Sequence, residues 1–198
     1  MNRIIQLSFK HKLSHIGSCL TVYPILEKIY NEKHINDEVI LSCGHAGLAQ
    51  YVSIENRSKG EINAEQMLEV MGIHPSRDIS RGIAVSTGSL GSGILIAVGF
   101  ALANKNRKVY CIISDGECAE GSVWEALAFI YKMELKNIIV HVNINGFSAY
   151  DSVDRNYLEN RLKTFLPDIN IHQTHNPSWL GGLNAHYHVM KKLTEFDN

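Results

Sequence analysis

Cysteine is scarce in this sequence, and the few cysteines present lie far apart. They occupy positions 19, 43, 111 and 118, without a closely spaced pair. This spacing excludes a disulfide-stapled scaffold and argues against a structural zinc site, which needs paired ligands at short intervals. Free cysteines are typical of proteins in a reducing compartment, so we expect a cytoplasmic protein.

A strong charge imbalance and a long apolar run are also absent. The 19 basic and 20 acidic residues give a formal charge of −1, so we expect no nucleic-acid partner and no membrane partner. The longest strongly apolar stretch, residues 94–103, is well short of the roughly 18 residues of a membrane span. We expect it to form a buried helix instead. Residues 1–13 contain only short apolar runs, so no signal peptide is expected.

The length of 198 residues suits one domain with a substantial core. We therefore expect a single domain over residues 1–198, with an irregular tail at 177–198 that forms a loop and one short strand. Hydrophobic patterning predicts helices at 2–12, 21–33, 46–56, 64–71, 92–105, 121–135 and 154–165, and strands at 38–42, 83–86, 109–113, 138–142 and 169–173. This alternation predicts an α/β fold, a doubly wound, mainly parallel sheet with helices on both faces.

Two polar residues follow two neighbouring strands of the predicted sheet. Asp115 lies just beyond the apolar run 109–113, and Asn145 lies just beyond the run 138–142. Because the carboxyl ends of neighbouring parallel strands lie side by side, we expect these two side chains to meet. Carboxylate and amide oxygens suit Mg²⁺ or Ca²⁺, and Mg²⁺ usually completes its shell with water and phosphate oxygens. The pair therefore predicts a site for a metal and an anion.

A glycine-rich segment, GSLGSG at residues 88–93, precedes the apolar helix. Its backbone can approach a ligand closely, while the helix N-terminus faces an anion. The spacing fits neither the dinucleotide fingerprint nor a P-loop. The alternative is a glycine turn that lets the helix pack tightly on the sheet, and the segment alone leaves both interpretations open.

Seven segments resemble one family, in that family's order. They resemble the amino-terminal, diphosphate-binding domain of transketolases, and are residues 14–18 (SHIGS), 41–46 (LSCGHA), 72–75 (GIHP), 87–93 (TGSLGSG), 115–121 (DGECAEG), 124–126 (WEA) and 143–145 (NIN). The resemblance runs from about residue 15 to about residue 151, some two thirds of the chain. It implies the thiamine diphosphate-binding fold and an enzyme whose Mg²⁺ or Ca²⁺ ion bridges the protein and the cofactor's diphosphate.

The resemblance also implies roles for single residues near the metal. Asp115 and the Asn145 side chain would bind the metal, with the Phe147 carbonyl as the third protein ligand. Gly116 would let the backbone approach a phosphate oxygen, because a side chain there would occupy the space of the diphosphate. Glu117, in the same motif, is assigned to the cofactor site as well.

Two further segments receive roles in the same way. Gly88, Ser89 and Leu90 resemble the segment that passes under the cofactor's rings, with Leu90 as an apolar support. Taken alone, Leu90 would be a core residue. Glu120 resembles a catalytic acid that links the two active sites of a dimer through bound water. The alternative for Glu120 is a solvated acid in the first turn of a helix, favoured by the helix dipole.

Four of the ten histidines are candidate site residues. His45 resembles a residue that contacts the cofactor diphosphate. His15 and His74 resemble catalytic residues that contact substrate hydroxyls and assist proton transfer, a duty that suits an imidazole titrating near neutrality. His186 corresponds to a later family histidine near the diphosphate.

The sequence departs from the family pattern in several places. Ser114 stands where the family usually has glycine, and Ile16 where it usually has proline. Only ten residues separate His175 from His186, too few for the helix and strand that the family places there. We therefore expect the fold to be truncated at its C-terminal end.

The family also needs a pyrimidine-binding domain, and none fits within the 198 residues. We therefore expect the diphosphate-binding subunit of a two-component enzyme, in a heterotetramer of two plus two chains, that transfers a two-carbon ketol unit between sugar phosphates. One alternative is a subunit of a thiamine diphosphate-dependent 2-oxoacid decarboxylase or acyl transferase. His15 and His74 favour a sugar substrate over a 2-oxoacid. The other is a catalytically silent regulatory subunit. Its expected residue losses are not seen, since Asp115, Asn145, His45 and His74 are all retained.

Overall fold

A parallel β-sheet forms the centre of the molecule. The computed structural model describes residues 2–148 and 151–193. In this part of the chain, the sheet has the strand order β1-β2-β3-β4, and all its pairs are parallel. The strands are β1 (Glu38–Leu41), β2 (Val109–Ser114), β3 (Ile138–Ile144) and β4 (Asn170–Gln173). All four coincide closely with predicted strands.

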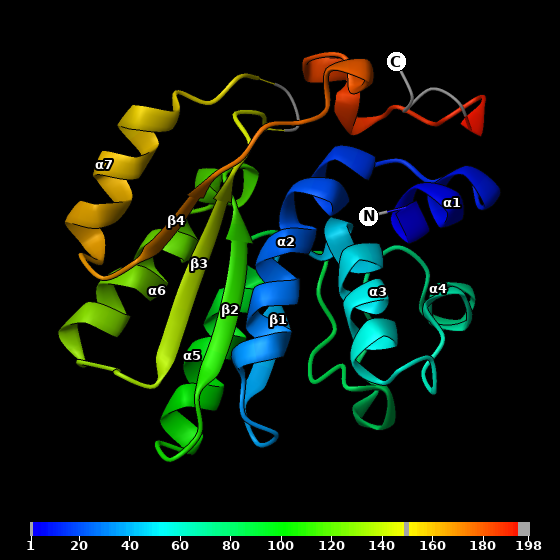
Figure 1. Cartoon of the computed structure of the whole chain (residues 1–198). Coiled ribbons are helices and arrows are strands. Elements are labelled where there is room, and N and C mark those ends of the chain that lie inside the picture. The colour runs from blue at the N-terminus through cyan, green and yellow to red at the C-terminus, as the bar shows by residue number, and fades with distance from the viewer. Residues whose placement is uncertain (1, 149–150, 194–198) are drawn as a thin grey trace.

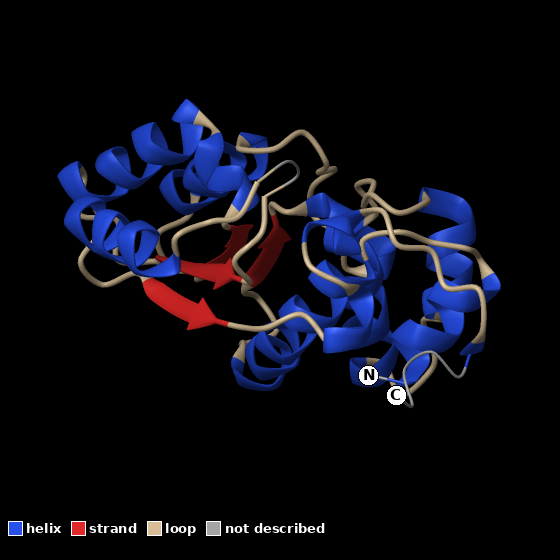
Figure 2. Ribbon diagram, turned by 90° about the horizontal axis from the view of Figure 1, so that it is seen from above, coloured by secondary structure: helices blue, strands red, loops and turns tan. Residues whose placement is uncertain are grey.

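Helices cover both faces of the sheet (Figures 1 and 2). One group consists of α1 (Asn2–Lys10), α2 (Ile16–Glu32), α3 (Gly47–Arg57) and α4 (Ala64–Met71). The second group, on the opposite face, consists of α5 (Ser92–Ala103), α6 (Gly121–Lys132) and α7 (Arg155–Phe165). The predicted α/β class, with a parallel sheet between two helical layers, is therefore confirmed.

Side chains of the central strands enter two hydrophobic clusters alternately. Leu41 and Ile112 pack with α1 to α4, whereas Ile40, Cys111 and Ile113 pack with α5 to α7. Successive residues of a strand point to opposite faces, so a strand buried on both sides needs a continuous apolar run. This explains why β2, buried along its whole length, was clear in the sequence.

One predicted strand and the predicted start of one helix were wrong. Residues 83–86 do not form a strand of the sheet, and only Ile83 makes an isolated antiparallel bridge, to Asp78. Because β1 pairs directly with β2, the sheet has no position for a strand between them, and this short apolar segment packs as an extended loop. Helix α2 begins at Ile16, five residues before its predicted start, which brings its N-terminus to the edge of the sheet where the loops converge.

Helix α5 and the tail also differ from expectation. Helix α5 is buried only on the face that carries Ile94 and Ala97, while Leu95 and Ile96 are 46% and 38% exposed. Residues 177–193 of the tail pass above α2 in the view of Figure 1. Its described part, residues 177–193, contains two short 3₁₀ turns at Ser178–Leu180 and Leu183–His186, and the expected strand is absent there.

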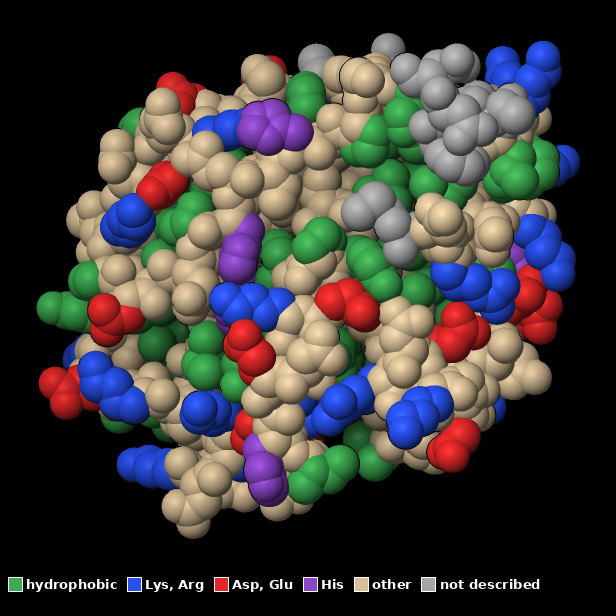
Figure 3. All heavy atoms as spheres, in the orientation of Figure 1, with side chains coloured by type: hydrophobic (Ala, Val, Ile, Leu, Met, Phe, Trp, Pro, Cys, Tyr) green, Lys and Arg blue, Asp and Glu red, His purple; other side chains and the backbone are tan. Residues whose placement is uncertain are grey.

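One face of the molecule carries charges of both signs. On the face shown in Figure 3, basic and acidic side chains are interspersed rather than gathered into one large region of either sign. None of the helices in the described part of the chain combines the length and apolar character needed to span a bilayer.

Candidate functional site

A cavity lies at the carboxyl edge of the sheet, where the predicted site residues converge. Its volume is about 180 Å³. The loops after β1, β2 and β3, the N-terminus of α2 and the tail all contribute to its walls. The lining residues are His15, Ser18, His45, His74, Gly88, Leu90, Ser114, Asp115, Gly116, Asn145, Phe147, Ser148 and His186. Most of the site residues predicted from the sequence therefore lie around one cavity.

The loops that follow β2 and β3 meet as predicted. Ser114 pairs with Asn143 in the parallel register, and the Asp115 amide donates to the Asn143 carbonyl at 3.0 Å. The Asp115 carboxylate accepts hydrogen bonds from the amides of Gly146 (2.7 Å) and Gly116 (3.1 Å). Burial raises the pKa of Asp115 to about 6, although these backbone donors oppose the shift. The carboxylate is thus held rigidly beside the Asn145 loop.

The geometry of this corner suits a cation bound to a diphosphate. The Asn145 side-chain oxygen accepts from the Phe147 amide at 3.0 Å, so the loop is curled around the group that would bind the metal. A Cβ added to Gly116 would meet protein atoms only at 3.8 Å. The protein itself does not require a glycine there, and the open space in front of Gly116 is available to a ligand. Hard oxygen donors beside such a space fit Mg²⁺ and a diphosphate.

Three of the lining histidines lie close together. The ring of His15 lies 4.4 Å from that of His186 and 5.3 Å from that of His45, centroid to centroid. The His15 amide also donates to the His186 carbonyl at 3.1 Å, and this contact ties the tail to the site. His186, assigned from the sequence by a loose correspondence, is therefore placed next to the better supported His15 and His45.

Burial keeps these imidazoles neutral. It lowers the pKa of His45 to about 3 and that of His15 to about 4, and the neighbouring histidines add to both shifts. Burial also lowers the pKa of His186. The Nδ1 atom of His15 is buried and has no hydrogen-bond partner. An unpartnered nitrogen of a neutral ring is free to contact a ligand.

The glycine-rich loop is held between two other site segments. Gly88 has a φ of 142°, and a Cβ on it would lie 2.9 Å from the ring of His74. A Cβ on Gly44, one residue before His45, would lie 2.6 Å from the Gly88 amide nitrogen. These close approaches bring His45, His74 and the loop together. Leu90 lines the cavity, whereas Ser89 is exposed and lies outside its lining.

Two acids of the DGECAEG motif lie away from the cavity lining. Glu120 is exposed at the N-terminus of α6. Glu117 is fully buried, and its Oε1 accepts from the Ser42 hydroxyl (2.6 Å) and the Gly91 amide (2.9 Å). Glu117 thus joins the loop after β1 to the glycine-rich loop. The cofactor contact assigned to Glu117 and the catalytic role assigned to Glu120 stay predictions.

The buried Glu117 makes the stability of the ligand-free chain depend on pH. Burial raises its pKa from about 4.5 to about 7, against the effect of its hydrogen bonds. The folded state therefore holds the proton more tightly, and this contribution to stability is full below about pH 4.5 and lost as the pH rises through 7. In Glu117→Gln the contribution is absent.

We expect the unfolding free energy of the wild type, relative to Glu117→Gln, to fall by on the order of 3 kcal/mol between about pH 4.5 and about pH 8. Urea denaturation at several pH values measures this difference. The comparison with the variant cancels the contribution of His15 and His45, whose lowered pKa values act with the opposite sign. A difference that does not change with pH would contradict the protonation assigned to Glu117.

Several residues around the site were missed in the sequence. Ser18 and Ser148 line the cavity, but single serines carry no recognisable signal. Asn176 lines a small adjoining hollow, and its side-chain oxygen is buried without a partner. Arg155 contacts the Asn145 loop from α7. No local sequence pattern predicts that Arg155 of α7 lies close to the Asn145 loop.

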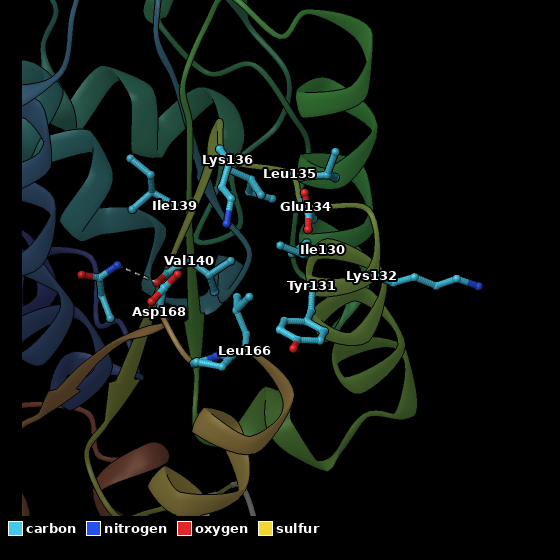
Figure 4. A pocket seen from close by; sticks show the side chains of 13 residues that line it. Ile130, Tyr131, Lys132, Glu134, Leu135, Lys136, Ile139, Val140, Leu166 and Asp168 are labelled. Carbon is cyan, nitrogen blue, oxygen red and sulfur yellow. Dashed lines mark hydrogen bonds between the residues drawn. The ribbon is translucent and has the colours of Figure 1, made fainter.

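A larger hollow lies at the opposite edge of the sheet (Figure 4). Its volume is about 460 Å³, and it is bounded by the C-terminal end of α6 and the start of β4. Figure 4 shows Tyr131, Lys136 and Asp168 among its lining side chains. None of the predicted site residues lies there. The smaller cavity at the carboxyl edge is therefore the candidate site, because most of the predicted site residues line it.

Known proteins share both the sequence pattern and the fold. Residues 10–167 match the family model described as "Transketolase, thiamine diphosphate binding domain". One subunit of the apulose-4-phosphate transketolase of Phocaeicola vulgatus is 30% identical in an alignment of 163 residues that covers 72% of this chain and 57% of that protein. The 6-deoxy-6-sulfo-D-fructose transketolase subunit SqwG of a Clostridium species is 33% identical in an alignment of 151 residues that covers 67% of this chain and 55% of that protein.

A solved transketolase structure has the same fold. The transketolase of Campylobacter jejuni superposes with a TM-score of 0.67 at 24% identity, over 92% of this chain and 39% of that protein. The chain thus spans about half the length of the two subunits that it resembles. Because the family model covers most of the sequence, this chain belongs to the transketolase family and carries its amino-terminal, thiamine diphosphate-binding domain.

Proposed function

We propose that this chain, as a single domain over residues 1–198, binds thiamine diphosphate through a Mg²⁺ or Ca²⁺ ion at the carboxyl edge of the sheet. The observation that carries the proposal is the meeting of the Asp115 carboxylate with the Asn145 loop, beside the open face of Gly116. Asp115, the Asn145 side chain and the Phe147 carbonyl would hold the metal. Oxygen donors of this kind suit both ions.

The remaining site residues would hold the rest of the cofactor and the substrate. His45 and His186 would contact the diphosphate as neutral donors. The segment from Gly88 to Leu90 would support the cofactor's rings, and its close packing against His74 would keep that support rigid. The cofactor, when bound, supplies the carbanion chemistry.

The reaction that we propose is the transfer of a two-carbon ketol unit between sugar phosphates. His15 and His74 would bind substrate hydroxyls, and the unpartnered Nδ1 of His15 is suited to that contact. The names of two relatives refer to ketoses that carry a phosphate or a sulfonate group. These names support an anionic ketose as the substrate class here.

We further propose that a separate cytoplasmic subunit supplies the pyrimidine-binding domain, in a heterotetramer of two plus two chains. Two relatives are named as subunits. The outward face of α5, where Leu95, Ile96 and Leu102 are exposed, supports a contact with another subunit, because exposed apolar groups on one helix favour burial at an interface. In that arrangement Glu120, exposed at the start of α6, would have access to the neighbouring chain.

Reconstitution with the product of the neighbouring open reading frame tests this function. The two chains together, with thiamine diphosphate and Mg²⁺, should transfer a ketol unit from a ketose phosphate to an aldose, and each chain alone should not. Product formation is followed by mass spectrometry. Turnover of a 2-oxoacid instead would favour the decarboxylase alternative, and cofactor binding without any turnover would favour a silent subunit. Turnover by the isolated chain would contradict the two-subunit proposal.

A further inference from the structure

Arg155, at the first position of α7, bridges two segments beside the candidate site. One arm of its guanidinium donates to the main-chain carbonyl of Asn145 at 2.6 Å. The other arm donates to Nε2 of His175 at 2.9 Å, since arginine has no acceptor. A Cβ on Gly146, whose φ is 92°, would lie 2.6 Å from the Arg155 Nε. The guanidinium therefore lies directly against the loop that carries Asn145.

The second segment, the turn after β4, also reaches the site. Thr174 follows the strand and donates through its hydroxyl to the Asn143 side chain at 2.7 Å. Two residues on, the Asn176 side-chain oxygen lies where a Cβ on Gly17 would be only 2.7 Å away. That oxygen is buried without a partner beside a small hollow that His15 and Asn145 also line. Residues 174–176 therefore lie beside the candidate site.

The guanidinium of Arg155 makes no ion pair with the described residues. Its hydrogen bonds go to a main-chain carbonyl and an imidazole nitrogen, and no carboxylate of residues 2–148 or 151–193 lies within 4.0 Å of its nitrogens. Structural arginines are usually paired with carboxylates. An unpaired guanidinium suits the neighbourhood of an anion, here the proposed diphosphate site on the other side of the Asn145 loop.

We propose that Arg155 is a positioning residue that fixes the loop of residues 145–147 to the turn of residues 174–176, so that the Asn145 side chain and the Phe147 carbonyl are preorganised for the metal. This inference rests on the proposed function. Residues that orient metal ligands without touching the metal typically change affinity by about 10–100-fold when they are removed.

The test compares Arg155→Ala with Arg161→Ala on the same helix. Arg161 is exposed and stacks on Trp124, 3.9 Å from guanidinium carbon to ring centroid, away from the site, so its removal takes the same charge from α7. Mg²⁺ is titrated by calorimetry at saturating thiamine diphosphate, with the partner subunit present. We expect the affinity for Mg²⁺ to fall about 10-fold or more in Arg155→Ala and to stay within about twofold of wild type in Arg161→Ala.

Added methylguanidinium distinguishes positioning from a general structural role. It should restore much of the Mg²⁺ affinity of Arg155→Ala, because it can occupy the vacated site and donate to the same two acceptors. Should Arg155→Ala fail to fold, Arg155→Lys replaces it, with an intermediate loss expected because an ammonium group lacks the planar fork that reaches both acceptors.

Three results would overturn the inference. They are wild-type Mg²⁺ affinity in the Arg155 variant, an equal loss in Arg161→Ala, or a loss that methylguanidinium does not reverse. A wild-type complex that binds no Mg²⁺ and cofactor would instead remove the proposed function, and this inference with it. Binding by the wild type with an unaffected variant would remove only the role of Arg155.

Discussion

Replacement of Asp115 by alanine should abolish the magnesium-dependent binding of thiamine diphosphate, with a loss of affinity of about 100-fold or more. The Asp115 side chain is 3% exposed and accepts from the amides of Gly116 and Gly146. Its removal takes away the one carboxylate among the proposed metal ligands, and the amide and carbonyl oxygens that remain are uncharged. Calorimetric titration of the cofactor with and without Mg²⁺ measures the loss.

Glu125→Ala is the matched control for Asp115→Ala. Glu125 is an exposed acid on α6 outside the cavity lining, so its loss should leave the affinity within about twofold of wild type, as expected for a distant surface charge. Thermal unfolding of both variants verifies that they are folded. Unchanged cofactor affinity in a folded Asp115→Ala chain would remove Asp115 from the metal site.

Gly91→Ala should destabilise the chain by several kcal/mol and displace the glycine-rich loop. Gly91 has a φ of 75°, which a residue with a side chain adopts only with strain. A Cβ there would also overlap the Ser122 hydroxyl and lie 2.8 Å from the Glu120 Cβ. Backbone strain costs about 1–2 kcal/mol, and overpacking adds about 1–3 kcal/mol. Urea denaturation measures the sum.

Gly60→Ala separates the two contributions. Gly60 has a similar φ of 87°, but a Cβ on it would meet nothing within 4 Å. This variant should therefore lose only the backbone part, about 1–2 kcal/mol. Equal destabilisation of the two variants would show that the contact between the glycine-rich loop and the start of α6 does not constrain position 91.

The main strands were predictable because a strand that is buried on both faces requires a continuous run of apolar residues. The apolar runs of β2 and β3 have no polar interruption except where a side chain meets a partner, as His141 meets His172 at 2.9 Å between ring nitrogens. Residues 83–86 carry a similar short run but form no strand. A run of three apolar residues does not reveal whether a neighbouring strand is available.

The exposed face of α5 marks a second limit. A helix that is apolar all round is normally buried, and α5 carries no charged residue, yet Leu95 and Leu102 are 46% and 42% exposed. We infer that another chain covers this face in the assembly that we propose, because the single chain buries only one side of the helix.

Some residues of the candidate site were predictable from the sequence and others were not. Spacing alone brought Asp115 and Asn145 together, because parallel strands fix where their following loops lie. The grouping of the histidines followed only from the family resemblance, since a single histidine carries no spatial information. The bridge made by Arg155 joins the start of α7 to the end of β4, and this contact depends on side-chain geometry that no short motif encodes.

The most direct test of the account is a calorimetric comparison of thiamine diphosphate with thiamine. Both are titrated into the chain together with its partner subunit, once with Mg²⁺ and once with a chelator. If this chain binds the cofactor's diphosphate through the metal, thiamine diphosphate should bind in the presence of Mg²⁺. Replacing thiamine diphosphate by thiamine, or chelating the metal, should then weaken binding by about 100-fold or more. Equal binding of thiamine and thiamine diphosphate, or binding indifferent to the chelator, would contradict that claim.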